Sequence, residues 1–253
     1  MTSLDSKKLF FGKAHDYSMY RPGYPDELFK ILRDKYGLNS DSIVCELGAG
    51  TGKFSKLVSA YCSKVFSVEP NKDMREEGIK NCEGTCVSYI DGSAEDTNLD
   101  SDSVSFVFAV QSFHWFNKET TKEEVRRILK KDGLFAIVWN DWEDKDNEFS
   151  VDYFKLISSW KERMTGEKFQ HKNVDDRKRF FKDSKYETET VIHSKKYSLK
   201  ELIGLTKSLS YAPSDNNPLY DEFINEVIKI FNKYSVDDTV TFDFHTEMFI
   251  GRV

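Results

Sequence analysis

The chain has 253 residues, enough for one large domain, and its 39% hydrophobic and 32% charged residues are typical of a globular protein. With 43 acidic and 37 basic side chains the net charge is −6, which argues against a general nucleic-acid-binding protein. No run reaches the roughly 18 apolar residues that cross a membrane.

The cysteines and the N-terminus indicate a reduced, cytoplasmic protein. Four cysteines are too few for a disulfide framework in a chain of this length, and the first residues lack the apolar core of a signal peptide. Cys82 and Cys86 stand four positions apart, but no further Cys or His pair completes a zinc site. We therefore expect no metal, no nucleic-acid partner and no membrane contact, and either a monomer or a homodimer.

An irregular arm precedes the first predicted helix. Its last third carries Tyr17, Tyr20 and Arg21 among prolines and further tyrosines. Such an arm either packs on the domain with an exposed arginine, or lies across the mouth of a pocket where the guanidinium binds a carboxylate. The spacing alone favours the first interpretation.

The next stretch organises the chain. A helix beginning near Pro25 leads to an apolar run at residues 43–47, followed by a glycine-rich turn through Gly48, Ala49 and Gly50. Helical spacing of apolar residues resumes directly after the turn. This is the pattern of the first β-to-α turn of an α/β sheet, where glycines let a ligand approach the backbone and the helix N-terminus offers N–H groups.

A second strand, residues 65–69, ends in an acid and a proline, Glu69 and Pro70. Glu69 follows the glycine turn by about 20 residues, the spacing at which α/β nucleotide folds place a carboxylate on ribose hydroxyls. The third and fourth strands, residues 87–90 and 104–110, also run into polar turns. The residues singled out in those turns are Ser93, Ala94, Glu95 and Gln111.

A fifth strand at residues 134–139 continues the alternation of strands and helices, which predicts a parallel, doubly wound sheet. Residues 141–184 then interrupt it as a helical insertion and possible lid, whose basic segment 177–182 is expected to be a solvated face with a buried pair of phenylalanines. A sixth strand at 187–197, two helices and a last strand at 239–250, returning to pair with the sixth, complete the chain.

The polar turns all follow the carboxyl ends of strands, the edge at which open α/β sheets bind ligands. The glycine turn has the spacing Gly-x-Gly-x-Gly, not the Gly-x-Gly-x-x-Gly of dinucleotide enzymes, and Glu46 stands just before it. A carboxylate there suits an amino group better than a pyrophosphate, because like charges repel. An adenosine that carries an amino acid, S-adenosylmethionine, fits this set.

Over essentially its whole length the chain resembles the class I S-adenosylmethionine-dependent methyltransferases. Residues 46–52, 68–70, 92–96 and 107–112 resemble the first to fourth motifs of that family. The Tyr-x-x-Tyr-Arg-Pro-x-Tyr-Pro arm, the Phe-His-Trp-Phe after the fourth strand and the late Ser-Leu-Ser-Tyr resemble the trans-aconitate methyltransferase-like, type 11 subgroup.

The resemblance implies one α/β domain with a Rossmann-like, doubly wound, mostly parallel seven-stranded sheet, an antiparallel last strand and a helical insertion. Its parts would be an N-terminal arm over the cofactor (1–24), a cofactor-binding core (25–140), the insertion (141–184) and C-terminal strands and helices that complete the sheet (185–253).

The resemblance also implies roles for the site residues. Glu46 and the glycine turn would hold the methionine portion of the cofactor, and Glu69 would accept hydrogen bonds from the ribose. Arg21 would pair with the cofactor carboxylate. Many relatives have aspartate where this chain has Ser93, which departs from the pattern at the adenine edge. The full set implied to bind the cofactor is Tyr17, Tyr20, Arg21, Glu46, Gly48, Ala49, Gly50, Glu69, Pro70, Ser93, Ala94, Glu95 and Gln111.

The candidate catalytic residue is His114, which follows the fourth motif. It would act as a general base, or it would form part of the pocket wall with Trp115, and the second interpretation is favoured. Asp141 and His171 are weaker candidates. Trp115, Phe116 and Trp139 predict apolar walls for an acceptor, unless they belong to the core.

We expect transfer of a methyl group to a small-molecule acceptor, with oxygen favoured. Two alternatives stay open: an NAD-dependent oxidoreductase, and a non-catalytic S-adenosylmethionine-binding sensor or scaffold. The glycine spacing and Glu46 count against the first. Intact motifs count against the second, although they indicate binding and not turnover.

Overall fold

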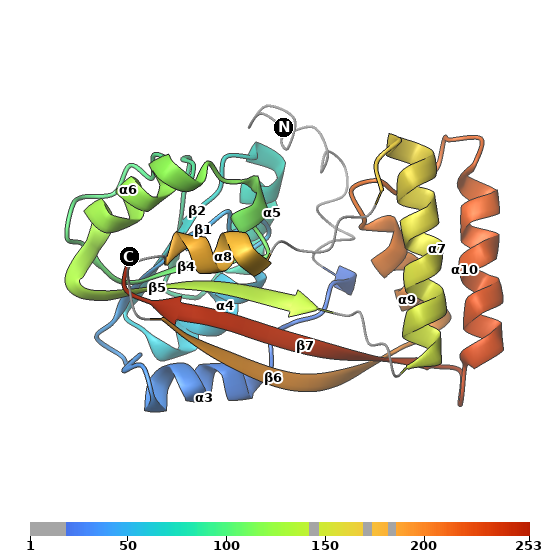
Figure 1. The fold of residues 1–253 in the computed structure, drawn as a ribbon, viewed down its shortest axis with the longest axis horizontal. Coiled ribbons are helices and arrows are strands. Elements are labelled where there is room, and N and C mark those ends of the chain that lie inside the picture. Colours follow the sequence, from blue (N-terminus) through green and yellow to red (C-terminus); the bar gives the residue numbers. More distant parts are fainter. Residues whose placement is uncertain (1–18, 142–146, 169–173, 182–185) are drawn as a thin grey trace.

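The computed structural model of the chain describes residues 19–141, 147–168, 174–181 and 186–253 (Figure 1). The strands are β1 (Ile43–Leu47), β2 (Lys64–Val68), β3 (Val87–Ile90), β4 (Val104–Val110), β5 (Leu129–Asp141), β6 (Tyr186–Tyr197) and β7 (Val240–Gly251). The α-helices are α3 (Asp26–Asp34), α4 (Lys53–Val58), α5 (Lys72–Asn81), α6 (Lys118–Ile128), α7 (Glu148–Thr165), α8 (Val174–Phe180), α9 (Leu199–Lys207) and α10 (Tyr220–Tyr234), with short 3-10 turns η1 (Ser59–Tyr61) and η2 (Phe113–Trp115).

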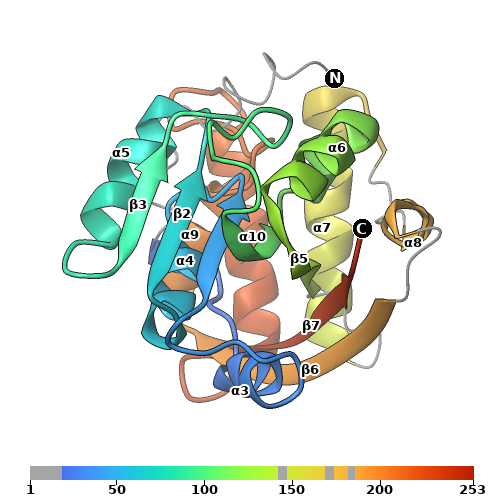
Figure 2. The same cartoon turned by 90° about the vertical axis from the view of Figure 1, so that its left-hand side faces the viewer.

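All seven strands form one sheet in the order β3-β2-β1-β4-β5-β7-β6 (Figure 2). The first five pair in parallel, and β7 runs antiparallel to both of its neighbours, β5 and β6. This confirms the predicted doubly wound sheet and the pairing of the last strand with the sixth. The strand order reverses between β1 and β4, which is the position where such sheets bind ligands.

Helices cover both faces of the sheet because its central strands are apolar on both sides. On one face, α3 and α4 pack over Val44, Phe108 and Val138. On the other face, α6 packs over Val107 and Ile137. Alternate residues of one strand therefore enter different cores, as expected for a parallel sheet buried on both faces.

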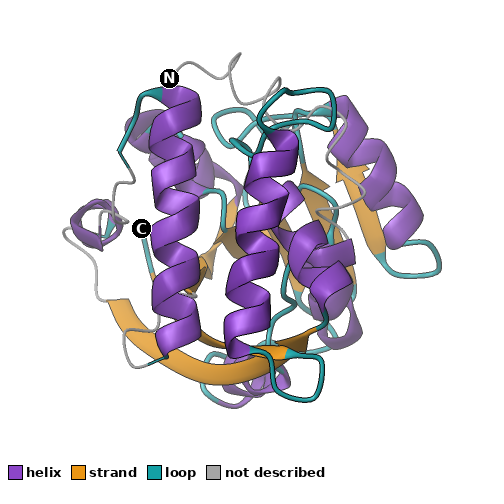
Figure 3. Cartoon of the chain, turned by 90° about the vertical axis from the view of Figure 1, so that its right-hand side faces the viewer, coloured by secondary structure: helices purple, strands orange, loops and turns teal. Residues whose placement is uncertain are grey.

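The β6–β7 hairpin extends beyond the rest of the sheet and carries a second body of helices. Residues 245–251 of β7 pair with β5, whereas residues 240–244 pair with β6 alone. Phe242 and Phe244, on this extension, pack against α7, α9 and α10. We call these three helices the helical layer; Figures 1 and 3 show them standing together, with α7 beside α10.

Two details differ from the sequence analysis. β5 begins at Leu129, because the polar residues before 134 continue the strand with a bulge opposite β4. The basic segment was expected to be solvated, which is wrong for Arg177: it is 3% exposed, and its Nη1 lies 3.2 Å from Glu247 Oε2. The expected buried pair, Phe180 and Phe181, is confirmed.

No helix in the described part of the chain has both the length and the hydropathy needed to cross a bilayer.

Candidate functional site

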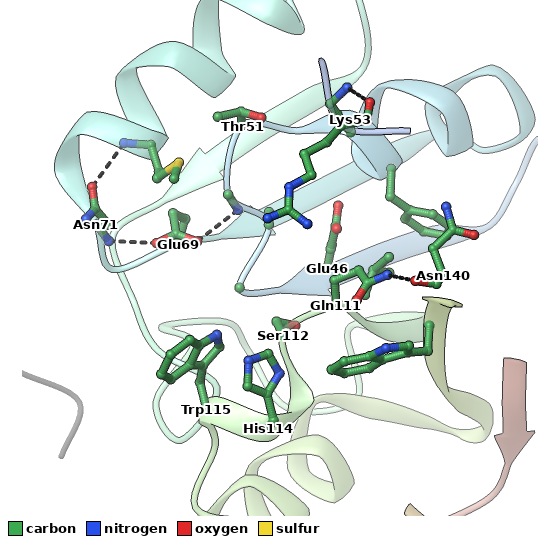
Figure 4. A pocket seen from close by; sticks show the side chains of 18 of the residues that line it. Glu46, Thr51, Lys53, Glu69, Asn71, Gln111, Ser112, His114, Trp115 and Asn140 are labelled. Carbon is green, nitrogen blue, oxygen red and sulfur yellow. Dashed lines mark hydrogen bonds between the residues drawn. The ribbon is translucent and has the colours of Figure 1, made fainter. Parts of the chain in front are cut away.

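A cavity of about 400 Å³ opens at the carboxyl edge of β1–β5, between the sheet and the C-terminal end of α9. It brings together nearly all the residues singled out in the sequence, and Figure 4 shows several of them facing one another across it. The predicted residues that line it are Arg21, Glu46, Gly48, Ala49, Gly50, Glu69, Pro70, Ser93, Ala94, Glu95, Gln111 and His114.

The acid at the end of β2 and the glycine turn after β1 are held to each other. Glu69 Oε2 accepts the backbone N–H of Gly50 at 2.8 Å, and its Oε1 accepts the N–H of Asn71 at 2.8 Å. Asn71 caps α5 by accepting the N–H of Met74 at 3.1 Å. Glu69 is only 7% exposed, so these contacts fix the carboxylate at the rim of the cavity (Figure 4).

The turn itself requires glycine at two positions. Gly48 has φ +66°, and a Cβ placed there would lie 2.7 Å from Ser112 Cβ. The Ser112 hydroxyl donates to Leu47 O at 2.7 Å, which holds the end of β4 against the turn. Gly52 has φ +79°, and its missing side chain leaves room for the Tyr89 hydroxyl, which donates to Gly50 O at 3.2 Å.

Glu46 lies beneath the turn, 2% exposed. Its Oε2 accepts the hydroxyl of Ser55, which in turn lies 2.6 Å from the hydroxyl of Ser67. Burial raises the pKa of Glu46 to about 8, and the charge of Glu69 adds to this rise. The carboxyl group is therefore mostly protonated at neutral pH in the free protein, and a neighbouring cation would ionise it.

The turn after β3 borders the cavity next to β2. Its residues Ser93 and Asp96 exchange backbone hydrogen bonds of 2.9 and 3.3 Å. The Ser93 hydroxyl accepts the N–H of Glu95 at 3.3 Å, so it supports the turn. Glu95 Oε1 accepts the N–H of Asn117 at 2.9 Å, which ties this turn to the start of α6.

Gln111, at the end of β4, has φ 57°, in the left-handed region that residues other than glycine rarely adopt. Its Nε2 donates to Asn140 O at 2.9 Å, and the Asn140 side chain donates to Gly23 O at 2.9 Å. Strained backbone of this kind is common at binding sites. Here the hydrogen bonds of Gln111 and Asn140 link the N-terminal arm, β4 and β5 around the cavity.

His114 stands on η2, exposed at the cavity between two indoles. Its ring centroid lies 4.6 Å from that of Trp115 and 5.2 Å from that of Trp139. Trp115, Phe116 and Trp139 all line the cavity. Behind Trp139, the guanidinium of Arg177 lies 5.6 Å from the indole centroid, so a buried cation supports this wall.

The N-terminal arm is placed in part as expected. Arg21 lines the cavity, and its Nε donates to Ser208 Oγ at 2.9 Å. Tyr20 does not line it; its ring packs against Gly204 in α9, where a Cβ would lie 2.2 Å away. Tyr20, which the resemblance assigns to the cofactor, thus packs against the helical layer instead. Tyr17 lies outside the described residues.

Lys53 is a site residue that the sequence analysis missed. It lines the cavity at the start of α4, and its Nζ donates to Arg21 O at 2.6 Å. Burial, together with the charges of Lys195 and Arg21, lowers its pKa to about 8. Its position directly after the glycine turn is the signal that points to it. Other missed lining residues are Tyr24, Thr51, Asn71, Met74, Asn140, Leu205, Leu209, Ser210, Tyr211 and Phe244.

The described residues of the insertion do not line the cavity, so the wall opposite the sheet comes from the end of α9 and not from residues 147–168 or 174–181. Asp141 ends β5 outside the cavity lining, and His171 lies outside the described residues. In the stretches that the structure describes, His, Cys, Asp and Glu side chains form no group of three or more that could bind a metal ion.

The chain is similar in sequence to known and named methyltransferases. A family model described as a methyltransferase domain matches residues 45–137. An uncharacterized methyltransferase from Schizosaccharomyces pombe is 28% identical over 236 residues, covering 91% of each protein. A protein from Saccharomyces cerevisiae, named as a probable S-adenosylmethionine-dependent methyltransferase, is 26% identical over 82% of this chain and 69% of its own length.

Solved structures share the fold at low sequence identity. A candidate type II methyltransferase from Anaeromyxobacter dehalogenans superposes with a TM-score of 0.68 at 18% identity, covering 92% of this chain and 98% of the other. A candidate methyltransferase of an antibiotic biosynthesis pathway from Anabaena variabilis gives a TM-score of 0.62 at 17% identity, covering 91% and 98%. At such identities the likeness concerns the fold alone.

Proposed function

Because the chain is a class I S-adenosylmethionine-dependent methyltransferase, we propose that it transfers the methyl group to an oxygen atom, of a carboxylate or a hydroxyl, on a small-molecule acceptor. The observation that carries the proposal is that one cavity of about 400 Å³ contains both the residues assigned to the cofactor and an aromatic wall. Cavities for small molecules usually have volumes of roughly 300–1,000 Å³.

For the cofactor, we assign the ribose hydroxyls to Glu69 and the ammonium of the methionine portion to Glu46. Both assignments are supported by the burial of the two acids and by the hydrogen bonds that already fix them, as a preorganised site requires. The glycine turn fits as well, because a Cβ at Gly48 would collide with Ser112. The turn containing Ser93 and Glu95 would border the adenine.

For the acceptor, we assign His114, Trp115 and Trp139 to a wall that orients the reacting group. Bound S-adenosylmethionine supplies an activated methyl with a neutral leaving group. These residues then need to hold an acceptor oxygen at roughly 3–3.5 Å from the methyl carbon and to exclude water. A carboxylate acceptor needs no base, whereas a hydroxyl acceptor would call on His114.

The test is turnover of methyl-labelled S-adenosylmethionine by the purified protein with fractionated small metabolites. Formation of S-adenosylhomocysteine that depends on an added fraction is expected, and a labelled product that mild alkali cleaves would identify a carboxylate ester. A product methylated on nitrogen or carbon would refute the oxygen assignment. Binding of the cofactor without turnover in any fraction would favour a sensor or scaffold.

We also propose a cytoplasmic location, supported by four cysteines that are all free thiols.

A further inference from the structure

The two edges of the sheet differ in length. β3 ends the sheet on one side with four residues, whereas β6 ends it on the other side with twelve (Figure 2). An edge strand presents a row of unpaired N–H and C=O groups, and folded proteins usually protect such edges with short strands, prolines or bulges. β3 is protected by its shortness, but β6 is long, since strands usually have about 5–6 residues.

β6 also lacks the other protections of an edge. Its twelve residues include no proline and no glycine, and they pair with β7 in one unbroken register from Tyr186 to Tyr197. In the described part of the chain, no strand pairs with the outer side of β6. The backbone groups on that side are therefore available to a further strand.

The middle of β6 presents an apolar side chain to solvent. Ile192 is 65% exposed, although it is large and hydrophobic. Thr190 and Ser194, which lie two residues away on the same face of the strand, are exposed as well. All three side chains are uncharged, so a second strand can pack along this face without burying a charge.

The charges of β6 are divided between its two halves. Glu187 and Glu189 lie before the middle, and Lys195 follows Ile192 at the same spacing by which Glu189 precedes it. Because side chains alternate along a strand, these three charged residues share the face opposite to Ile192. A lysine on an edge strand usually prevents pairing. An antiparallel copy of this strand would instead bring the lysine to the acids.

Within one chain these charges are not balanced. Glu187 and Glu189 share a single lysine, Lys35, whose Nζ lies 2.6 Å from an oxygen of each. Two carboxylates against one ammonium leave one negative charge. Lys195 pairs with no carboxylate among the described residues, and its Nζ lies 4.5 Å from the ring centroid of Tyr197. The first half of β6 thus needs a cation, and the second half has one to offer.

We propose that the outer edge of β6 is the interface of a homodimer, in which β6 of a second copy pairs antiparallel with it across a two-fold axis near Ile192. The axis places Ile192 against Ile192 of the partner subunit, and Glu189 opposite Lys195 of the partner subunit. A parallel copy would set acids against acids. Pairing along β6 forms roughly ten backbone hydrogen bonds, a number typical of protein interfaces.

The test measures the molar mass of the purified protein by sedimentation equilibrium over roughly 1–100 µM. The wild type should approach twice the 29.5 kDa of the chain as the concentration rises. Ile192→Lys places two like charges at the axis and should weaken association by roughly tenfold or more. Ile79→Lys is the matched control, because Ile79 is 55% exposed on α5, beside the opposite edge of the sheet (Figure 2), and this variant should dimerise like the wild type.

An exchange of charges tests the direction of pairing. One variant carries Glu187→Lys with Glu189→Lys, and another carries Lys195→Glu. Each sets like charges against each other in the antiparallel dimer, so each alone should be mostly monomeric. Mixed together, the two variants restore opposite charges at both ends of the interface and should form heterodimers. Circular dichroism of each variant alone establishes that it is folded.

Three results would contradict the interface. A wild type that keeps the mass of one chain over the whole concentration range would overturn it. Dimerisation that Ile192→Lys leaves intact would place the contact on another surface. A mixture of the two charge variants that associates no more than either variant alone would refute the antiparallel two-fold arrangement. No residue of β6 lines the cavity, so these outcomes do not depend on the proposed methyl transfer.

Discussion

Glu69 Oε2 and the backbone N–H of Gly50 lie 2.8 Å apart, and this bond joins the acid after β2 to the turn after β1. The other carboxylate oxygen accepts the N–H of Asn71. A carboxylate oxygen can accept more than one hydrogen bond, so these contacts are compatible with binding of ribose hydroxyls. Glu69 thus builds the turn and, under our proposal, also binds the cofactor.

We expect Glu69→Gln to weaken S-adenosylhomocysteine binding by about 10- to 100-fold, because charged hydrogen bonds are lost and the amide group faces a backbone N–H donor. Calorimetric titration measures this loss. Glu76→Gln is the control, since Glu76 forms an exposed pair with Lys72 on α5 and its replacement should change nothing. Unchanged affinity in a folded Glu69→Gln protein would remove the ribose assignment.

Two glycines of the turn should respond differently to alanine. Both have positive φ, +66° at Gly48 and +56° at Gly50, so alanine strains the backbone at either position by about 1–2 kcal/mol. Only at Gly48 would the new Cβ also meet a neighbour, Ser112 Cβ at 2.7 Å, whereas nothing lies within 4 Å at Gly50. Gly48→Ala should therefore be the more destabilising change.

Thermal or denaturant unfolding measures the difference. Adding Ser112→Gly to Gly48→Ala should recover the part of the loss that comes from the clash. The same addition to Gly50→Ala should recover nothing. Equal losses at Gly48 and Gly50 would show that the close approach of β4 to the turn does not limit the site.

The sheet could be predicted because its signals are local. The mostly apolar runs at residues 43–47 and 104–110 are short and followed by turn residues, and both form largely buried strands. The start of β5 could not be predicted, since Lys130, Lys131 and Asp132 are exposed and polar, and β5 reaches back to Leu129 through its pairing with Val104 on the far side of a bulge. The local sequence pattern does not indicate where β5 begins.

The site residues also divide into those that local motifs predict and those that only long-range packing places. The glycine turn and Glu69 belong to motifs that the chain spells out within a few residues. Arg177 appeared to belong to a solvated run because its partner, Glu247, is 70 residues away. Tyr20 and Tyr211 depend on how the arm packs against α9, which no spacing along the chain expresses. Long-range packing, not local propensity, decides these positions.

A third prediction concerns acid stability. Glu124 on α6 is 8% exposed, and burial alone would raise its pKa. Hydrogen bonds from Arg127, at 2.7 and 2.8 Å, and from Thr97 outweigh burial and lower the pKa to about 2. A carboxylate whose pKa is lower in the folded protein stabilises the fold above its unfolded pKa of about 4.5, and this contribution is lost as the pH falls toward 2.

Glu124→Gln should therefore lower the free energy of unfolding by about 1–3 kcal/mol at pH 7. The difference from the wild type should shrink as the pH falls below about 4.5 and disappear near 2. Urea unfolding at pH 7, 5 and 3 tests this. A difference that stays constant across that range would show that packing of Glu124, and not its charge, provides the stability.

The last prediction follows from the protonated state of Glu46. With a pKa of about 8 it carries its proton at pH 7 in the free protein. An ammonium group bound beside it favours the ionised form and lowers this pKa, so cofactor binding should release close to one proton, roughly 0.9, at pH 7. Lys53, whose pKa is also about 8, is already mostly charged at pH 7, so a bound carboxylate can draw little compensating uptake from it.

Calorimetric titration with S-adenosylhomocysteine in phosphate and in Tris at pH 7 counts these protons, because the two buffers differ in their enthalpy of ionisation. The observed binding enthalpy should differ between them by the enthalpy of about one proton in the wild type. Glu46→Gln has no proton to lose, so its enthalpies should agree in the two buffers. The same agreement in the wild type would mean that Glu46 does not meet the ammonium group, and that its buried carboxyl serves only to hold Ser55 beneath the turn.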